Sequence, residues 1–352
     1  FNVDSPKQLG HILFEVLGME PKKKTKGKTG FSTDASVLAE LATEHELPGL
    51  VLKYRELAKI KSTYIDALPP LRAGDGLVHT SFNEKVTTTG RLSSSHPNLQ
   101  NIPVRTEFGR KIRECFVPLA SDHVYVSADY SQIELRLLAH LSEDAGLIAA
   151  FTSGADFHAS TAAQVFDVPI ERVTPEMRSR AKAVNFGIVY GQQAYGLSQS
   201  LGISFGEAKD MIDRYFATYP RVRTYLDETV EFARKHGFAQ TMFGRRRYIP
   251  ELAQRNPIRK QFGERTAMNH PMQGSAADII KIAMRQVQER LVEEGLQARV
   301  MLQVHDELDL SVPQAELSQV EALLKSVMEN AASLRVPLNV DVSHGSNWSE
   351  AH

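Results

Sequence analysis

The segment 174–191 carries the pattern that most restricts how this chain can fold. Thr174-Pro175-Glu176 predicts a helix start, because it places a hydroxyl N-cap, a proline at the first helical position and an acid in the first turn. Gly191 predicts the helix end. Between them, two cations and then two aromatic residues recur every four positions, so they form one slowly winding stripe. These residues are Arg178, Lys182, Phe186 and Tyr190.

Such a stripe fits a ligand with an anionic end and a flat end, as a nucleotide has. The same pattern also suits an ordinary amphipathic helix with a solvated basic edge and buried aromatic rings. The segment alone does not separate these two interpretations, so the rest of the chain has to decide.

Composition narrows the class of protein. The 352 residues are 42% hydrophobic and 24% charged, which is typical of a soluble globular protein with two or three subdomains. The net charge of −1 means that any contact with nucleic acid must come from local clusters. The sequence has no run of about 18 apolar residues, so it indicates no transmembrane helix. Cys115 is the only cysteine, which fits a reducing compartment, and we expect it to be a small core residue.

Residues 1–70 are predicted to be helical. The expected helices run from Ser5-Pro6 to Gly18, from a cap at Ser32 or Thr33 to about residue 46, and from about residue 48 to 66. The chain opens with phenylalanine rather than methionine, so we expect it to be a piece of something longer.

Five lysines occupy the loop between the first two of these helices. A charge run of this kind is usually solvated, but its density also suits contact with a phosphate backbone, and the pattern leaves both open. The lysines are Lys22, Lys23, Lys24, Lys26 and Lys28.

Two acidic positions follow predicted strands. Residues 123–129 alternate apolar and polar side chains, and a helical pattern runs from Ser131 to Leu141, so Asp129 lies at a strand end. Residues 299–304 and 308–312 are apolar runs that predict a hairpin with Asp306 at or near its turn. If Asp129 and Asp306 met, they would suit two magnesium ions about 3.5–4 Å apart. The spacing does not establish that meeting, and acids are common in turns for structural reasons.

Two further patterns favour purely structural roles. Ser131-Gln132-Ile133-Glu134 fits a capping box, in which Ser131 and Glu134 satisfy backbone donors at a helix start. Residues 264–294 read as a long helix that is broken near Pro271 and Gly274.

Three segments, in this order, resemble motifs A, B and C of family A DNA polymerases. They are Asp129-Tyr-Ser-Gln-Ile-Glu-Leu-Arg136, the Arg178–Gly191 stripe, and Gln303-Val-His-Asp-Glu307. Residues 61–64, 89–94, 98–105 and 272–278 match the family as well, so the resemblance covers essentially the whole chain.

The resemblance implies an α+β right-hand polymerase fold, with an antiparallel sheet in the palm and helical fingers and thumb. The expected domains are a partial thumb at 1–75, a first part of the palm at 76–140, fingers at 141–262 and a second part of the palm at 263–352. The exonuclease and 5′-nuclease domains of longer relatives have no counterpart in this sequence.

The implied reaction is template-directed addition of a dNTP to a primer 3′-OH, with release of pyrophosphate. Asp129 and Asp306, with the backbone carbonyl of Tyr130, would hold two Mg²⁺ ions. One ion would lower the pKa of the 3′-OH, and the other would neutralise the triphosphate and the leaving group. Glu307 would be an auxiliary catalytic carboxylate near the metals.

The stripe would bind the dNTP. Arg178, Lys182 and His158 would contact the triphosphate, and Lys182 would also protonate the departing pyrophosphate. Phe186 would pack against the nucleotide, and Tyr190 would stack at the templating position.

Two residues of motif A would complete the nucleotide site. Glu134 would become the gate against a ribose 2′-OH, which overrides the capping-box interpretation, although one side chain could serve both roles. Gln132 would bind the dNTP beside it.

The family's DNA contacts are also carried over by position. Arg91 and Gln273 would donate to minor-groove acceptors, which are nearly the same for every base pair. Asn269 and Arg265 would support them, and His305 would contact DNA. The lysine loop would follow the duplex backbone.

Three alternatives remain at this point. A single-subunit RNA polymerase shares the palm and a related motif B, but Glu134 and the Phe186-Gly187 pair argue against it. A catalytically dead DNA-binding subunit is disfavoured because both candidate metal aspartates are present. A two-metal nuclease would leave the stripe and the minor-groove residues without a purpose.

The expected partners are primer–template DNA and dNTPs, with no membrane, and the protein is expected to be a monomer. The expected location is the cytoplasm of a bacterial or phage-infected cell, or an organelle if the source is eukaryotic.

Overall fold

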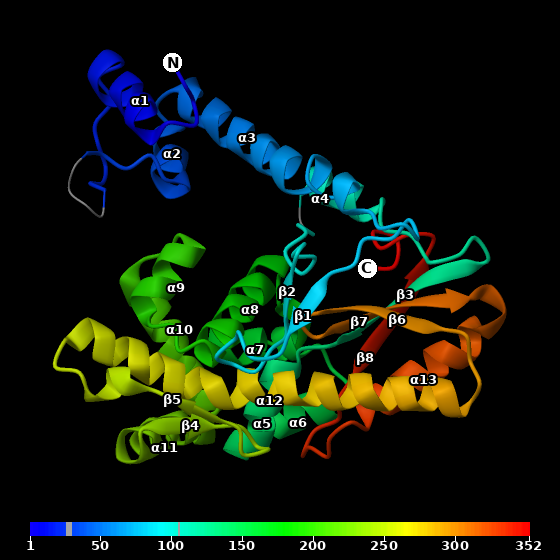
Figure 1. Cartoon of the computed structure of the whole chain (residues 1–352). Helices are drawn as coiled ribbons and strands as arrows, with labels where there is room; N and C mark the ends of the chain where they lie inside the picture. Colours follow the sequence, from blue (N-terminus) through cyan, green and yellow to red (C-terminus); the bar gives the residue numbers. More distant parts are fainter. Residues whose placement is uncertain (26–29, 105) are drawn as a thin grey trace. The chain divides into compact units, whose positions relative to one another are not determined.

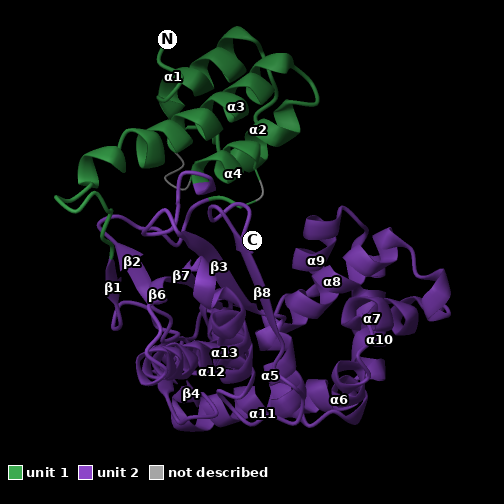
Figure 2. Cartoon of the chain, turned by 90° about the vertical axis from the view of Figure 1, so that its right-hand side faces the viewer, with its two compact units in different colours: residues 1–80, 103–112 green, residues 81–102, 113–352 purple. Residues whose placement is uncertain are grey.

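The computed structural model describes residues 1–25, 30–104 and 106–352. The chain divides into two compact units, coloured separately in Figure 2. Unit 1 comprises residues 1–80 and 103–112, and unit 2 comprises residues 81–102 and 113–352.

Unit 1 is helical, as expected for this part of the chain. Its small core is built from Leu9, Leu13, Val37, Leu38, Leu41 and neighbouring apolar residues. The second helix begins after Asp34, whose side chain caps Val37, rather than after Ser32 or Thr33. The helices are α1 (Pro6–Gly10), a π-helical turn (His11–Val16), α2 (Ala35–Leu41), α3 (Glu46–Ile60), a second π-helical turn (Lys61–Ile65) and most of α4 (Glu107–Arg113).

Unit 2 is organised around an antiparallel sheet with strand order β6-β7-β3-β8. The strands are β3 (His123–Tyr130), β6 (Arg299–Val304), β7 (Glu307–Pro313) and β8 (Val340–Gly345). The predicted strand at 123–129 and the predicted hairpin at 299–312 are therefore both present.

The two faces of this sheet differ in chemistry because side chains alternate along each strand. On β3 and β7 one face carries Val126, Ala128, Leu308 and Leu310, which join the main core together with α12 (Pro257–Glu293) and α13 (Leu317–Glu329). Figure 1 shows α12 and α13 alongside this sheet. The opposite face of β3 and β7 is polar, and its residues are Tyr125, Ser127, Asp129, Glu307, Asp309 and Ser311.

Helices between β3 and α12 build the rest of unit 2. They are α5 (Ile133–Ser142), α6 (Ala145–Thr152), α7 (Phe157–Phe166), α8 (Pro175–Val189), α9 (Ala194–Leu201), α10 (Phe205–Thr218) and α11 (Pro220–His236). Two short hairpins accompany them, β1 (Ser81–Asn83) with β2 (Ser93–Ser95) and β4 (Phe238–Gln240) with β5 (Arg246–Tyr248). The candidate stripe lies on α8, which begins after the Thr174 cap and ends before Gly191, as predicted.

Two further predictions, about α12 and Cys115, were also wrong. The helix α12 is not broken near Pro271 and Gly274 but is continuous from Pro257 to Glu293. Its middle is buried, and this packing offsets the hydrogen bond that the proline cannot make. Cys115 is exposed rather than a core residue. Among the described residues, no helix is long and apolar enough to cross a membrane.

Candidate active site

The structure brings Asp129 and Asp306 together on the polar side of the sheet. Asp129 ends β3, where it lies opposite Glu307 of β7 and opposite Asp341 of β8. Asp306 occupies the two-residue turn between β6 and β7, and its carbonyl accepts a hydrogen bond from the Tyr130 N–H at 3.2 Å. Pairing of the strands thus brings Asp129 and Asp306 together, which the sequence did not establish.

This arrangement concentrates negative charge. Burial, followed by the charges of Glu307, Asp306 and Asp341, raises the pKa of Asp129 to about 7. Burial also raises the pKa of Asp306, although Arg91 opposes it. Asp341 was missed in the sequence, where the alternation of Val340-Asp341-Val342-Ser343 was the available signal for a strand with a polar face.

The oxygen donors suit a hard cation. The turn and strand end offer two carboxylates and the Tyr130 carbonyl, and Mg²⁺ typically takes one or two protein carboxylates, with waters and substrate phosphates as its other ligands. The described residues contain no group of three or more His, Cys, Asp or Glu side chains that could hold a metal ion by themselves. A cation would also relieve the charge that raises the pKa of Asp129.

Glu134 does not form a capping box, so that expectation was wrong. The helix α5 begins at Ile133, and its N-cap is Gln132, whose left-handed backbone (φ 57°) gives no side-chain cap. The Glu134 carboxylate instead accepts a hydrogen bond from Arg91 at 2.9 Å, and the same Arg91 nitrogen lies 3.4 Å from Asp306. Glu134 is buried, and Arg91 links it to Asp306. Burial is the main cause that raises the pKa of Tyr190, and the charge of Glu134 raises it further.

The stripe on α8 faces α7. Arg178 forms an ion pair with Asp156 at 2.7 Å, and the ring of Phe186 lies 5.9 Å from that of His158. Burial and then the charges of Lys182 and Arg178 lower the pKa of His158 to about 4. The imidazole is therefore neutral at pH 7, close to two cations that suit a polyanionic ligand.

His158 is also oriented by its neighbours. Its Nδ1 lies 3.0 Å from the Asn185 amide nitrogen, so Nδ1 accepts and Nε2 carries the proton. Tyr190 ends the stripe with a side chain that is 47% exposed, which leaves its ring accessible to a stacking partner.

The candidate DNA-binding residues of α12 lie near the end of α8. Asn269 donates to the Val189 carbonyl at 3.3 Å, and Arg265 packs against Gly191. Gln273 lies one turn further along the same side of the helix, since it follows Asn269 by four residues. His305 adopts a left-handed backbone (φ 53°) in the turn that also holds Asp306.

The described lysines of the loop have different surroundings. Lys22 forms ion pairs with Glu44 at 3.1 Å and with Glu20 and Glu40 at 3.9 Å. Lys23 pairs with Asp34 at 3.2 Å. Lys24 makes no ion pair with any residue that the structure describes, and Lys26 and Lys28 lie outside the described residues.

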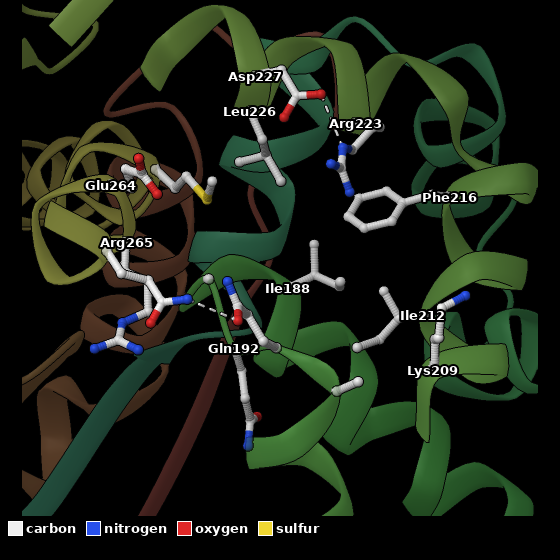
Figure 3. A pocket seen from close by; sticks show the side chains of 15 residues that line it. Ile188, Gln192, Lys209, Ile212, Phe216, Arg223, Leu226, Asp227, Glu264 and Arg265 are labelled. Carbon is white, nitrogen blue, oxygen red and sulfur yellow. Dashed lines mark hydrogen bonds and ion pairs between the residues drawn. The ribbon is translucent and has the colours of Figure 1, made fainter. Parts of the chain in front are cut away.

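A separate cavity of about 260 Å³ lies beside the end of α8, and none of the carboxylates above lines it. Figure 3 shows Ile188, Ile212 and Leu226 pointing into it. The side chains of Arg265 and Gln192 contribute to its polar rim. The cavity thus adjoins the stripe without containing the candidate catalytic groups.

Comparison with known proteins decides the family. Residues 1–350 match the model of DNA polymerase family A. The chain belongs to this family. It is 53% identical over 352 residues to DNA polymerase I of Geobacillus stearothermophilus and 51% identical over 355 residues to that of Pseudomonas aeruginosa. These alignments cover 100% of the chain but only 40% and 39% of the two relatives.

Solved structures agree with this assignment. The polymerase domain of Pol1 from M. smegmatis, in complex with a DNA primer–template and dNTP, matches with a TM-score of 0.93 and 48% identity, over 100% of this chain and 62% of that one. The expected α+β polymerase fold is therefore confirmed. Family A membership also implies a general dependence on divalent metal. The boundaries expected between thumb, palm and fingers stay predictions.

Proposed function

We propose that this chain is the polymerase part of a DNA-directed DNA polymerase that adds dNTPs to a primer 3′-OH on a DNA template. The observation that carries the proposal is the meeting of Asp129 and Asp306 at the edge of the polar sheet face, near the cation-and-aromatic stripe of α8 and Glu134. The chain spans less than half the length of the curated relatives it matches, so the activity of the whole protein is part of this proposal.

Asp129, Asp306 and the Tyr130 carbonyl would hold two Mg²⁺ ions. When bound, these ions lower the pKa of the 3′-OH and neutralise charge on the triphosphate. The chain's own contribution is to place two carboxylates on a paired strand end and a tight turn, where sheet hydrogen bonds hold the backbone of both residues. Glu307 adds a third carboxylate beside them.

The incoming nucleotide would lie along the stripe. Arg178 and Lys182 would pair with the phosphates, and neutral His158 would donate from Nε2. Lys182 is the proposed proton donor to the leaving pyrophosphate. Phe186 would pack against the nucleotide, and Tyr190 would stack at the templating position.

Further residues would reject ribonucleotides and bind the DNA. Glu134 would exclude a ribose 2′-OH, and Gln132 would line the same site. Arg91 and Gln273 would read the minor groove with the support of Asn269 and Arg265, and His305 would contact the DNA. The partners would be primer–template DNA and dNTPs. A monomeric state, the absence of a membrane partner and a cytoplasmic location in a bacterial cell stay predictions.

The decisive experiment is magnesium-dependent primer extension on a defined template, with each dNTP supplied separately. We expect extension only with the complementary dNTP. Extension with rNTPs at comparable rates would favour an RNA polymerase, and shortening of a labelled primer in magnesium without dNTP would favour a nuclease.

Asp129→Asn and Asp306→Asn test the metal ligands, because an amide keeps the shape of the side chain but loses its charge. Each variant is expected to lower the single-turnover rate by at least about 10³-fold, while the Kd for primer–template stays within threefold. Residual extension near the wild-type rate in either variant would contradict the assignment of that carboxylate. Retention of binding with loss of extension also separates an active polymerase from a binding subunit.

A further inference from the structure

A buried polar cluster lies behind the carboxylates, further along the same sheet face. At its centre is Glu307, which is 5% exposed. Its Oε1 accepts a hydrogen bond from the Ser127 hydroxyl at 2.7 Å and another from the indole Nε1–H of Trp348 at 3.1 Å. Trp348 is about 40 residues away in the sequence and belongs to none of the family motifs that predicted the site.

The Trp348 ring has little freedom to move. It is fully buried, it lies stacked with Tyr125 at 6.2 Å between centroids, and it meets Phe116 edge-on at 5.5 Å. The guanidinium of Arg113 lies 3.9 Å over it. The Trp348 backbone N–H also donates to the Phe116 carbonyl at 2.9 Å. These contacts aim the indole N–H at one point, which the Glu307 carboxylate occupies.

Asp309 closes another side of the cluster. It follows Glu307 by one pleat on the same face of β7, and it is fully buried. Burial and the charge of Glu307 raise the pKa of Asp309 well above its usual range. Burial acts to raise the pKa of Glu307, but the hydrogen bond with Asp309, the His352 charge and the donors Ser127 and Trp348 lower it overall.

We propose that Trp348 is a positioning residue for nucleotide transfer: its indole N–H, backed by the stacked rings and joined by the Ser127 hydroxyl, fixes the Glu307 carboxylate beside Asp129. The inference deepens the proposed function and rests on it. Glu307 pairs with Asp129 across the sheet, so a rotation of its carboxylate would move a negative charge within the reaction centre. Two donors from separate parts of the chain, the Ser127 hydroxyl and the Trp348 indole N–H, oppose that rotation.

The first test is Trp348→Phe, which keeps an aromatic ring against Tyr125, Phe116 and Arg113 but removes the indole N–H. Loss of one hydrogen bond to a charged group corresponds to roughly a 10-fold effect. We therefore expect a roughly 10-fold lower single-turnover rate, with the KM for dNTP and the Kd for primer–template within twofold of wild type. A control is Tyr215→Phe on α10, which also removes a polar group from a fully buried aromatic side chain, but one whose hydroxyl bonds to no described residue.

A second pair of variants keeps the proposal testable if Trp348→Phe does not fold. Ser127→Ala removes the other donor to Glu307 Oε1, and Ser127→Thr keeps a hydroxyl at that position. The alanine variant is expected to lose rate as Trp348→Phe does, and the threonine variant to retain most of it. Equal rates for the two Ser127 variants would show that the orientation of Glu307 does not set the rate and would overturn the proposal.

The discriminating experiment repeats Trp348→Phe in a Glu307→Ala background. Once Glu307 has no carboxylate, the indole has nothing to position, so no further loss is expected. An equal loss in both backgrounds would show a general structural role and overturn the proposal, and so would an unchanged rate with Glu307 intact. A crystal structure of Trp348→Phe gives a readout independent of activity, with Glu307 expected to reorient. Absence of extension by the unsubstituted chain would instead count against the proposed function.

Discussion

Arg91 illustrates how single residues couple parts of the site. One of its terminal nitrogens lies 2.9 Å from Glu134 and 3.4 Å from Asp306, although the three residues come from a loop, a helix and a turn. Arg91 opposes the burial that raises the pKa of both carboxyl groups. The proposed sugar gate and the proposed metal ligand therefore share one cation, and substitution of Arg91 will affect both.

The buried side chain of His270 leads to a prediction about how the stability of the folded protein depends on pH. It is fully buried on α12, and burial is the main cause that lowers its pKa to about 4. The unfolded chain, with an ordinary histidine pKa near 6.5, binds the proton first as the pH falls. Stability is therefore lost between about pH 6.5 and pH 4, and His270 contributes about 2 kcal/mol of that loss at pH 5.

Urea unfolding of the wild type and of His270→Phe at pH 7 and pH 5 measures this contribution. The variant differs in absolute stability, so the comparison is the change between the two pH values. We expect a smaller change in the variant because it has lost one titrating group. An identical change in both proteins would show that His270 does not titrate as described.

At the scale of elements, the position of α12 depends on a close approach to the β4–β5 hairpin. A Cβ on Gly274 would lie 2.6 Å from Thr241 Cγ2 and 3.0 Å from His270 Cε1. The Thr241 hydroxyl donates to Asp278 at 2.9 Å, and Asp278 also pairs with Arg245 at 2.7 Å. Glycine at 274 thus permits α12 and the hairpin to share a buried polar network.

Gly274→Ala is expected to destabilise the protein by about 1–3 kcal/mol, as overpacking in a tight site does. The matched control is Gly206→Ala near the start of α10, where the nearest heavy atom to a new Cβ is 3.9 Å away. That substitution should be neutral or stabilise by up to about 1 kcal/mol through helix propensity. Chemical unfolding of both variants measures the difference, and equal effects would contradict the close approach at Gly274.

At the scale of the whole molecule, the lysine loop belongs to unit 1 and the carboxylates to unit 2. We predict that substitutions in the loop lower DNA affinity without changing the single-turnover rate at saturating DNA. Lys24→Ala should reduce the slope of log K against log salt by about 1. Lys22→Ala should change it little, because three glutamates surround that ammonium group.

The Kd for primer–template, measured for each variant from low to moderate salt, tests the predicted order of Lys24 and Lys22. Lys7→Ala in α1 is the control, because Lys7 lies outside the loop. A large loss of single-turnover rate at saturating DNA would contradict a role confined to backbone contact. An equal slope change for Lys22 and Lys24 would show that the ion pairs of Lys22 do not persist in the complex.

Local signals in the sequence determined the elements that carry the site. The cap at Thr174, the stop at Gly191, the alternation at 123–129 and the paired apolar runs around Asp306 all predict structure from neighbours a few residues apart. The motif resemblance added the family, because its residues are read in order along the chain. These features depend on short-range backbone and side-chain preferences, so the sequence carries them directly.

Only the tertiary structure decided what the site residues touch. Arg91 pairs with Glu134 and Asp306, which no local pattern indicated, and its predicted contact with DNA stays a prediction. The capping box that the local pattern favoured for Glu134 does not form. Asp341 and Trp348 reach the carboxylates from the end of the chain. Such contacts join residues far apart in sequence, and burial rather than local propensity selects them. No short pattern encodes which distant group will neutralise or orient a buried charge.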